Sequence, residues 1–268
     1  MKILNLALIG KDVSMSHSPE IHAFIAEKLG YAINYQKLSV PEDKFEEQIG
    51  GIMNKYDGFN VTIPYKLSIM PHLQKISGYA SEFGAVNTVK TSTRTGYNTD
   101  GLGFKLMLKS NGVDVEGKEV LVLGAGGAGR SVAKTLSDGG AKVFLYNRSF
   151  EKAASVAKEF GGVTALKTLE NQPYFAIINA TGVGMHDTVG KSPVGDGLIE
   201  LCEVAVDLIY NPAKTEFLRI AESLNKKIVN GFGMLFYQAY YSACIFAGIT
   251  PDEKSARALF REFLKETK

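Results

Sequence analysis

A glycine-rich segment in the middle of the chain constrains the fold more than any other feature. The apolar run at residues 120–123 leads directly into Gly-Ala-Gly-Gly-Ala-Gly. Three of these glycines match the pattern GxGxxG, namely Gly124, Gly126 and Gly129. A continuous apolar run is typical of a central parallel strand, and the glycines allow a tight turn, close approach to a pyrophosphate and close helix–strand packing. The segment therefore predicts a strand–turn–helix unit that binds a dinucleotide.

Strand and helix patterns alternate along the rest of the chain. We expect strands at residues 3–9, 35–40, 59–63, 120–123, 143–146, 175–179 and 204–208, and a β-ribbon at 85–90 and 94–98. We expect helices at residues 19–29, 41–53, 101–109, 128–137, 151–160, 215–224, 233–247 and 252–265. Ser18 and Gly30 are the expected N-cap and stop signal of the first helix. This alternation predicts an α/β fold with a mostly parallel sheet.

The length of the chain favours two domains. A chain of 268 residues fits one large domain or, more readily, two that share a cleft. The boundary is expected near residues 100–103, between the β-ribbon and the glycine-rich unit. The pattern leaves open which domain the helices beyond residue 233 join.

Composition and charge exclude several classes of protein. The net charge of +2, without any long run of like charges, gives no footprint for nucleic acid. No stretch reaches the roughly 18 apolar residues of a membrane span, and the apolar N-terminal run is too short for a signal peptide. Cys202 and Cys244 are expected to be buried in a protein of the reducing cytoplasm. Neither they nor the histidines show metal-ligand spacing, so no metal is expected.

The end of the strand at 143–146 bears on which dinucleotide binds. NAD sites usually carry an acid roughly 20 residues after the first glycine, but the segment Tyr146-Asn147-Arg148-Ser149 holds none. The Arg148 guanidinium is suited to stack on adenine and to pair with a 2′-phosphate. Lys152 adds charge nearby, and Ser149 can cap the next helix or bind the phosphate. We therefore expect NADP rather than NAD, the alternative being a solvated Arg and Lys on a surface helix.

Polar side chains gather at loops and strand ends in the first half of the chain. They are Ser14, Ser16, Ser18, Asn60, Thr62, Lys66, Asn87, Thr88, Asn98, Thr99 and Asp100. If the fold brings them together, they suit a small polyhydroxylated carboxylate. Lys66 and Asp100 are the pair suited to proton transfer in carbonyl reduction, because a lysine can protonate the oxygen and a carboxylate can orient the lysine. Taken singly, Lys66 is more often a surface lysine and Asp100 more often a helix N-cap.

Segments between residues 14 and 239 closely resemble, in the same order, motifs of the shikimate dehydrogenase family. Ser-His-Ser-Pro at 16–19 resembles the family's serine motif for the substrate carboxylate. Gly-Phe-Asn-Val-Thr-Ile-Pro-Tyr-Lys at 58–66 resembles its catalytic lysine signature. The other matching segments are 84–88, 96–101, 124–130, 147–149, 207–212 and 231–239.

The resemblance implies a reaction and a set of site residues. The reaction is the reduction of 3-dehydroshikimate to shikimate with NADPH, in the route to chorismate and the aromatic amino acids. The catalytic pair would be Lys66 and Asp100. Substrate would be bound by Ser16, Ser18, Asn60, Thr62, Asn87, Tyr210 and Gln238. NADP would be bound by Gly124, Ala125, Gly126, Gly127, Ala128, Gly129, Asn147, Arg148, Ser149, Lys152, Thr181, Gly231 and Met234.

The resemblance also implies a domain organisation. The fold would be two α/β domains around a deep cleft, the second a Rossmann-type NADP-binding domain. The substrate-binding catalytic domain would hold residues 1–100 plus 233–268, and the NADP-binding domain residues 101–232. The implied partner is the small-molecule substrate, with neither nucleic acid nor membrane. The chain is expected to be a cytoplasmic monomer or homodimer.

The chain departs from the family's pattern at three places. Residues 10–13 read Gly-Lys-Asp-Val where the family often has Gly-Asn-Pro-Ile, Ser149 replaces a threonine, and Lys152 replaces a frequent arginine. An ammonium cannot pair bidentately with phosphate, so the preference for NADP is expected to be softer than usual. Two alternatives stay open. One is a relative that acts on quinate or uses NAD, and the other is a nucleotide-sensing protein without catalysis, which the presence of both Lys66 and Asp100 disfavours.

Overall fold

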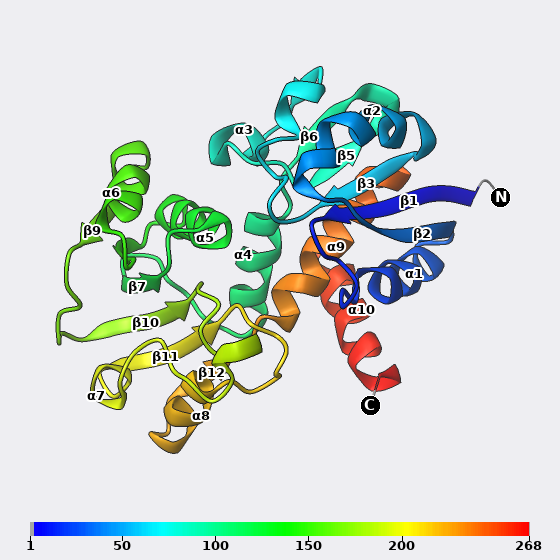
Figure 1. Ribbon diagram of the computed structural model, residues 1–268. Helices are drawn as coiled ribbons and strands as arrows, with labels where there is room; N and C mark the ends of the chain where they lie inside the picture. Colours follow the sequence, from blue (N-terminus) through cyan, green and yellow to red (C-terminus); the bar gives the residue numbers. More distant parts are fainter. Residues whose placement is uncertain (1–2, 268) are drawn as a thin grey trace. The chain divides into compact units, whose positions relative to one another are not determined.

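The computed structural model describes residues 3–267, which fall into two compact units. Unit 1 holds the chain up to Gly103 together with the segment from Phe236 onward, and unit 2 holds Phe104–Leu235. Two helices, α4 (Asp100–Ser110) and α9 (Phe232–Ala247), carry the chain across this division (Figure 1). Most of α9 and all that follows it therefore belong with the N-terminal sheet, a point that the sequence pattern leaves open.

Unit 1 is built on a mixed six-stranded sheet. Its strands are β1 (Ile3–Gly10), β2 (Ala32–Ser39), β3 (Gly58–Val61), β4 (Lys75–Ile76), β5 (Thr88–Lys90) and β6 (Thr95–Tyr97). They lie in the order β2-β1-β3-β5-β6-β4. β1 runs parallel to β2 and β3, β4 runs parallel to β6, and β5 pairs antiparallel with β3 and β6. The predicted β-ribbon is thus the pair β5–β6, shortened to three residues in each strand.

Helices cover this sheet and supply its core. They are α1 (Ser18–Lys28), α2 (Phe45–Lys55), α3 (Tyr79–Phe83), α9 and α10 (Glu253–Glu266). The core shared with α2 includes Ala7, Ile9, Phe45, Ile49 and Phe59. Phe236 of α9 packs against Phe24 of α1 and Phe263 of α10, with ring centroids 6.3 and 5.4 Å apart. These neighbours on more than one side explain why the sequence of α9 is apolar around most of its circumference.

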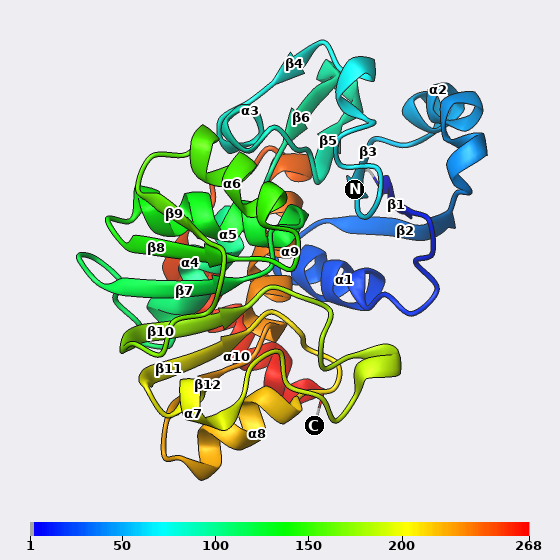
Figure 2. The same ribbon diagram turned by 60° about the vertical axis from the view of Figure 1, so that its left-hand side comes forward.

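Unit 2 is built on a six-stranded sheet in which every pair is parallel. Its strands are β7 (Glu119–Leu123), β8 (Lys142–Tyr146), β9 (Val163–Leu166), β10 (Tyr174–Asn179), β11 (Cys202–Asp207) and β12 (Lys227–Val229). The order β12-β11-β10-β7-β8-β9 is the 3-2-1-4-5-6 order of a Rossmann fold, read from the opposite edge (Figure 2). The strand order reverses between β7 and β10, and the glycine-rich loop follows β7 at this switch point.

The helices of unit 2 follow the strands in turn. They are α5 (Gly127–Asp138), α6 (Phe150–Glu159), α7 (Asp196–Ile199) and α8 (Glu216–Ser223). Short 3-10 turns occur at Glu42–Lys44, Met70–His72 and Thr91–Thr93 in unit 1 and at His186–Thr188 in unit 2. Thr215 caps α8 by accepting the main-chain N–H of Leu218. Within the described part of the chain, no helix is long and apolar enough to span a bilayer.

Some local expectations are wrong. His17, not Ser18, is the N-cap of α1, because the Ser18 hydroxyl is engaged by Ser16 and α1 already begins at Ser18. The stop at Gly30 is confirmed by its left-handed φ of 79°. The sequence pattern also gave no sign of β4, β9, β12, α3 or α7. These elements have two to five residues each, which is too short for a periodic signal.

Candidate active site

Lys66 and Asp100 meet in unit 1. The Nζ atom of Lys66 lies 2.6 Å from Oδ2 of Asp100, and their side chains are 22% and 11% exposed. Lys66 stands in the turn after β3, where its carbonyl accepts the main-chain N–H of Val86. Asp100 begins α4, and its main-chain N–H donates to Oδ1 of Asn98 at 2.9 Å. The pair forms a charge-assisted hydrogen bond that holds an ammonium at the edge of solvent.

Asn87 holds the second oxygen of this carboxylate. Its Nδ2 donates to Oδ1 of Asp100 at 2.8 Å and to Oγ1 of Thr99 at 3.0 Å. Its Oδ1 accepts the main-chain N–H of Thr99 at 2.9 Å and the hydroxyl of Thr88 at 2.8 Å. The Asn87 side chain is buried, so these bonds form out of water. Because both oxygens of Asp100 accept a hydrogen bond, the plane of the carboxylate is fixed toward Lys66.

A second buried amide, Asn60, connects β3 to α9. Its Nδ2 lies 3.0 Å from Oγ of Ser242 and 3.1 Å from Oγ1 of Thr88, and its Oδ1 accepts the hydroxyl of Tyr35 at 2.8 Å. The Ser242 hydroxyl also lies 2.7 Å from that of Thr88 and 3.1 Å from that of Thr99. Polar side chains from separate stretches of the sequence therefore form one connected network.

The serine motif lies at the start of α1. The Ser16 hydroxyl donates to Oγ of Ser18 at 3.0 Å, and the main-chain N–H of Ser18 donates to Oγ of Ser16 at 3.2 Å. Ser18 is buried, whereas Ser16 is half-buried. Desolvation raises the pKa of Tyr35, and a hydrogen bond with Ser18 opposes that shift. Tyr35 thus joins the serine motif to Asn60.

Thr62 and Gln238 stand next to this network along the chain. Thr62 is half-buried, and its main-chain N–H donates to the carbonyl of Ile9 at 2.8 Å. A Cβ on Gly10 would lie 2.5 Å from the Thr62 methyl group, so the close approach of these two segments requires a glycine. Gln238 is half-buried one turn before Ser242 and therefore shares its face of α9. Thr62 follows Asn60 by two residues and Gln238 precedes Ser242 by one turn, so both residues are neighbours of network residues along the chain.

In unit 2 the glycine-rich loop has the geometry that its pattern predicts. Gly124 has a left-handed φ of 103°, and a Cβ there would lie 2.9 Å from the carbonyl oxygen of Ala180. A Cβ on Gly129 would lie 1.9 Å from the carbonyl oxygen of Gly124, because strand end and helix touch at this point. Gly126 has open space where a side chain would be, and it is the N-cap of α5. The loop backbone is therefore accessible beside a helix N-terminus, which favours an anion.

Asn147, at the end of β8, ties this loop to the next helix. The main-chain N–H of Ala125 donates to its Oδ1 at 3.1 Å, and its Nδ2 donates to the carbonyl of Ser149 at 3.0 Å. Arg148 lies between these two residues and is exposed. The backbone of Arg148 is therefore held next to the loop, while its side chain is exposed to solvent.

The start of α6 holds the remaining residues predicted to bind a 2′-phosphate. Ser149 occupies the N-cap position, but its hydroxyl donates to Oε2 of Glu151 at 2.9 Å and caps no main-chain N–H. Lys152 is exposed in the first turn. A phosphate here would meet two cations, Arg148 and Lys152, and one carboxylate.

Buried polar groups shape the ends of β10 and β11. The main-chain N–H and the hydroxyl of Thr181 both donate to Oδ1 of Asn179, at 3.0 and 2.6 Å. Asn179 in turn donates to the fully buried Asp207 at 3.1 Å. Burial raises the pKa of Asp207, and hydrogen bonds from Thr215, Ile209 and Asn179 oppose the shift. Thr181 is thus fixed at the carboxyl edge of the sheet, beside the glycine-rich loop's contact at Ala180.

Tyr210, Gly231 and Met234 lie beyond the ends of β11 and β12. Tyr210 is half-buried, burial raises its pKa, and its ring lies 6.5 Å from that of Phe232. A Cβ on Gly231 would lie 2.0 Å from the carbonyl oxygen of Leu208, so no other residue fits there. Met234 is half-buried in the first turn of α9. All three belong to unit 2, including Tyr210, which is predicted to bind substrate.

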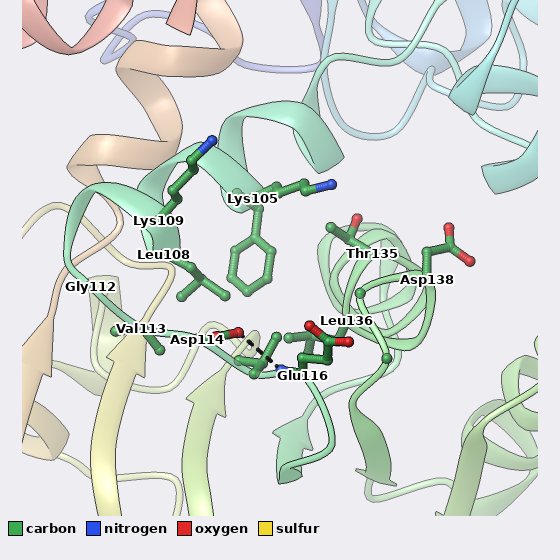
Figure 3. Close-up of a pocket in the computed structure, with 14 residues that line it drawn as sticks. Lys105, Leu108, Lys109, Gly112, Val113, Asp114, Glu116, Thr135, Leu136 and Asp138 are labelled. Carbon is green, nitrogen blue, oxygen red and sulfur yellow. Dashed lines mark hydrogen bonds between the residues drawn. The ribbon is translucent and has the colours of Figure 1, made fainter. Parts of the chain in front are cut away.

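Figure 3 shows a cavity of about 660 Å³ in unit 2, and no residue of the glycine-rich loop lines it. It is lined by α4, the segment after it and the C-terminal end of α5. Its charged side chains are Lys105, Lys109, Asp114, Glu116 and Asp138. A helix C-terminus carries negative partial charge, and the three carboxylates outnumber the two lysines, so this cavity suits phosphate groups less well than a helix N-terminus does. The opposite end of α5 suits a dinucleotide.

In the part of the chain that the structure describes, the histidine and cysteine side chains offer no metal site, and His22, Cys202 and Cys244 are buried. Within residues 3–267, no cluster of three or more His, Cys, Asp or Glu side chains is placed to hold a metal ion. Cys202 and Cys244 are free and buried, as expected, and burial raises the pKa of Cys202 to about 11. His22 stacks on Tyr35 with ring centroids 4.7 Å apart, and burial lowers its pKa to about 3.

Two family models match the chain, one in each unit. The model of the shikimate dehydrogenase substrate binding domain matches residues 8–89, and the model described as shikimate / quinate 5-dehydrogenase matches residues 106–189. A shikimate dehydrogenase (NADP(+)) from Carboxydothermus hydrogenoformans is 37% identical over 259 residues, or 92% of each chain. This chain belongs to the shikimate dehydrogenase family.

Solved structures of the family share this fold. A chorismate mutase/shikimate 5-dehydrogenase fusion protein from Clostridium acetobutylicum matches with a TM-score of 0.91 and 39% identity, over 100% of this chain and 99% of that one. A shikimate 5-dehydrogenase from Thermus thermophilus, solved with NADP(H) and shikimate, matches with a TM-score of 0.87 and 35% identity, over 97% and 99%. The predicted fold class, two α/β domains with a Rossmann-type second domain, is confirmed.

The residues that the family's motifs single out fall into one set in unit 1 and one in unit 2. The unit 1 set is Ser16, Ser18, Asn60, Thr62, Lys66, Asn87, Asp100 and Gln238. Hydrogen bonds connect most of this set through two residues that the sequence does not single out, Tyr35 and Ser242. Tyr35 reads only as a strand residue and Ser242 only as part of an apolar helix. No local signal could have found them, because their partners lie far away in the sequence.

Proposed function

We propose that this protein catalyses the reversible NADPH-dependent reduction of 3-dehydroshikimate to shikimate, a step of chorismate and aromatic amino-acid biosynthesis. The observation that carries the proposal is the Lys66–Asp100 pair, held by Asn87 in a chain of the shikimate dehydrogenase family. Without this pair, family membership would be compatible with a protein that binds nucleotide and performs no chemistry.

Lys66 would transfer the proton in this reaction. NADPH, when bound, supplies the hydride for the carbonyl carbon. Negative charge then develops on the carbonyl oxygen, so a donor at that oxygen lowers the barrier. The Lys66 ammonium has three protons and gives one of them to Asp100 as a hydrogen bond, which leaves two for the substrate. In the reverse direction the same nitrogen would accept the proton of the substrate hydroxyl.

The other unit 1 residues would bind and orient the substrate. The paired hydroxyls of Ser16 and Ser18 suit the carboxylate, since the Ser16 proton, which is donated to Ser18 in this structure, can turn to an anion instead. Thr62 and Gln238 suit the ring oxygens, whereas the Asn87 amide already donates to Thr99 and Asp100 and would contact a ring oxygen only by sharing one of these bonds. Asn60 would act from behind these groups, because its amide already bonds Tyr35 and Ser242.

The unit 2 residues fit NADP. Open backbone at Gly126 and Gly127 suits the pyrophosphate, with Ala125, Ala128 and Gly129 completing the loop. Arg148 and Lys152 would hold the 2′-phosphate, with Asn147 and Ser149 positioning them. Thr181, Gly231 and Met234 would line the nicotinamide end, and Tyr210 would contact the substrate from this unit.

The two units would divide the work accordingly. Residues 1–100 plus 233–268 would form the substrate-binding catalytic domain, and residues 101–232 the NADP-binding domain. The family model matched to residues 8–89 is described as a substrate binding domain, which supports this division. Two free buried thiols are in keeping with a cytoplasmic protein.

A crossed assay tests the proposal. Formation of NADPH or NADH is followed by absorbance, with shikimate or quinate as substrate and NADP or NAD as cofactor. Turnover is expected with shikimate and NADP. Absence of that activity would refute the proposed function. Equal rates with NAD would refute the cofactor preference alone, and a higher rate with quinate would refute the substrate assignment alone.

A further inference from the structure

We infer that Ser242 is a positioning residue for the Lys66–Asp100 pair, acting through Thr88 and Asn87. The inference rests on the proposed function, because it names what holds that catalytic pair in place. Ser242 lies on α9 and is fully buried. Its hydroxyl reaches three side chains from three other parts of unit 1, namely Asn60, Thr88 and Thr99.

The direction of the bond between Ser242 and Thr88 follows from counting protons. The Thr88 hydroxyl has one proton, and it donates that proton to Oδ1 of Asn87 at 2.8 Å. In the 2.7 Å contact between Thr88 and Ser242, Ser242 must therefore be the donor. With its proton used, Ser242 accepts from Nδ2 of Asn60, while the hydroxyl of Thr99, 3.1 Å away, has one proton for two acceptors, Ser242 and Oδ1 of Asn87. Ser242 is thus engaged both as a donor and as an acceptor.

This order of donors sets the orientation of Asn87. Its Oδ1 faces the main-chain N–H of Thr99, a donor that cannot be reversed, and the hydroxyl of Thr88. Nδ2 must then face Asp100, where it donates at 2.8 Å. Asp100 accepts this bond on Oδ1 and the Lys66 ammonium on Oδ2. A continuous chain of hydrogen bonds thus runs from the Ser242 hydroxyl to the Lys66 nitrogen.

Removal of the Ser242 hydroxyl would loosen this chain without touching substrate or cofactor. Thr88 would keep Nδ2 of Asn60 as a donor but lose the shorter bond from Ser242, so its hydroxyl would be held less firmly toward Asn87. Asn87 would then be held less firmly against Asp100, and Lys66 would sample positions from which proton transfer is slower. A single hydrogen bond of this kind supports an effect of about three- to tenfold on kcat.

The experiment compares Ser242→Ala, Ser242→Thr and Thr88→Val with a matched control, Cys244→Ala. Cys244 is also small, buried and on α9, but it has no place in the network. We expect Ser242→Ala to lower kcat about three- to tenfold with KM for NADP unchanged, and Cys244→Ala to leave kcat as in wild type. Ser242→Thr restores the hydroxyl, so its kcat should exceed that of Ser242→Ala although its extra methyl group crowds the core.

A double variant tests the route of the effect. Because Ser242 and Thr88 act through the same amide, the loss in Ser242→Ala/Thr88→Val should be smaller than the product of the two single losses. Wild-type kcat in Ser242→Ala, or equal kcat in the Ala and Thr variants, would overturn the inference. If Ser242→Ala fails to fold, Thr88→Val decides, and wild-type kcat there would overturn it.

A readout without turnover separates this inference from the proposed function. In ¹⁵N-labelled wild-type protein, the side-chain amide protons of Asn87 should exchange slowly with solvent, and in Ser242→Ala they should exchange faster. If wild type lacks activity with shikimate and NADP, the proposed function fails while this measurement still tests the network. Equal exchange in both proteins would refute the role of Ser242.

Discussion

Asn87 and Asp100 face each other with Nδ2 and Oδ1 2.8 Å apart, on the side of the carboxylate opposite Lys66. The carboxylate therefore has a neutral donor on one oxygen and an ammonium on the other. Asn87 belongs to the segment just before β5, whereas Asp100 begins α4 just after β6. The antiparallel pairing of these two short strands is what brings the residues together, so the ribbon has a direct part in building the site.

Lys66 should control turnover more than substrate binding. Replacement by alanine removes the proton donor, and we expect Lys66→Ala to lower kcat by about 10²- to 10⁴-fold with little change in KM for shikimate. Steady-state kinetics of the purified variant measure both constants. Lys75→Ala, which removes an exposed lysine of β4, is the control and should behave as wild type. A change confined to KM would mean that Lys66 only binds substrate.

Arg148 should distinguish NADP from NAD. Its exposed guanidinium is suited to the 2′-phosphate that only NADP carries, so Arg148→Ala should raise KM for NADP about tenfold or more and barely alter that for NAD. The control is Lys158→Ala, which removes an exposed cation from the last turn of α6, the helix that follows Arg148. An equal effect on both cofactors would defeat the assignment of Arg148 to the phosphate.

Substitutions of the second and third glycines of the loop, Gly126 and Gly129, should have different effects on the protein. In Gly129→Ala the new Cβ would come 1.9 Å from the carbonyl oxygen of Gly124, and backbone cannot give way cheaply. We expect the free energy of unfolding to fall by about 1–3 kcal/mol, measured by urea denaturation. In Gly126→Ala the Cβ enters open space at an ordinary φ of −76°, so stability should be retained.

The cofactor should respond to Gly126→Ala instead. The new methyl group would hold a pyrophosphate away from the loop backbone, so NADPH affinity should fall about tenfold or more. Titration of each variant with NADPH, followed by fluorescence, supplies the measurement. A Gly126→Ala protein with wild-type affinity would show that the pyrophosphate does not approach this loop.

His22 should make folding stability depend on pH. Burial lowers its folded-state pKa from 6.5 to about 3, so the folded protein resists a proton that the unfolded chain accepts. Stability from this group is therefore complete above pH 6.5 and is lost as the pH falls toward 3, by at most about 1.4 kcal/mol per pH unit.

His22→Phe keeps an aromatic ring against Tyr35 and removes the titrating group. The free energy of unfolding of wild type should fall relative to this variant between neutral pH and pH 5, as measured by urea denaturation. Parallel pH profiles for wild type and His22→Phe would contradict the prediction.

Much of unit 2 could be predicted from the sequence because its signals are local. The apolar strand, the glycine spacing and the next strand fall within residues 119–146, and the structure has β7, α5 and β8 there. The same kind of reasoning misplaced the N-cap of α1, since a serine before a proline favours capping unless another partner takes its hydroxyl. At Ser18 that partner is Ser16.

The unit 1 site could be predicted only in part. Lys66 and Asp100 stand out because their chemistry suits the reaction and their motifs match the family. Tyr35 and Ser242 do not stand out, because a tyrosine in a strand and a serine in an apolar helix are ordinary. Their roles arise from contacts to Asn60, which lies 25 and 182 residues away along the chain.

Local sequence was enough to predict the Rossmann unit, the candidate proton donor and the absence of an acid at the end of β8. These features depend on backbone constraints and side-chain chemistry within short segments, where residue type and spacing suffice. The role of Ser242 in closing the network behind Asn87 emerges only from the folded structure, and the residue pattern alone left open that α9 joins the N-terminal sheet. A hydrogen bond is directional and acts over about 3 Å, so it exists only once folding has brought distant segments to that distance.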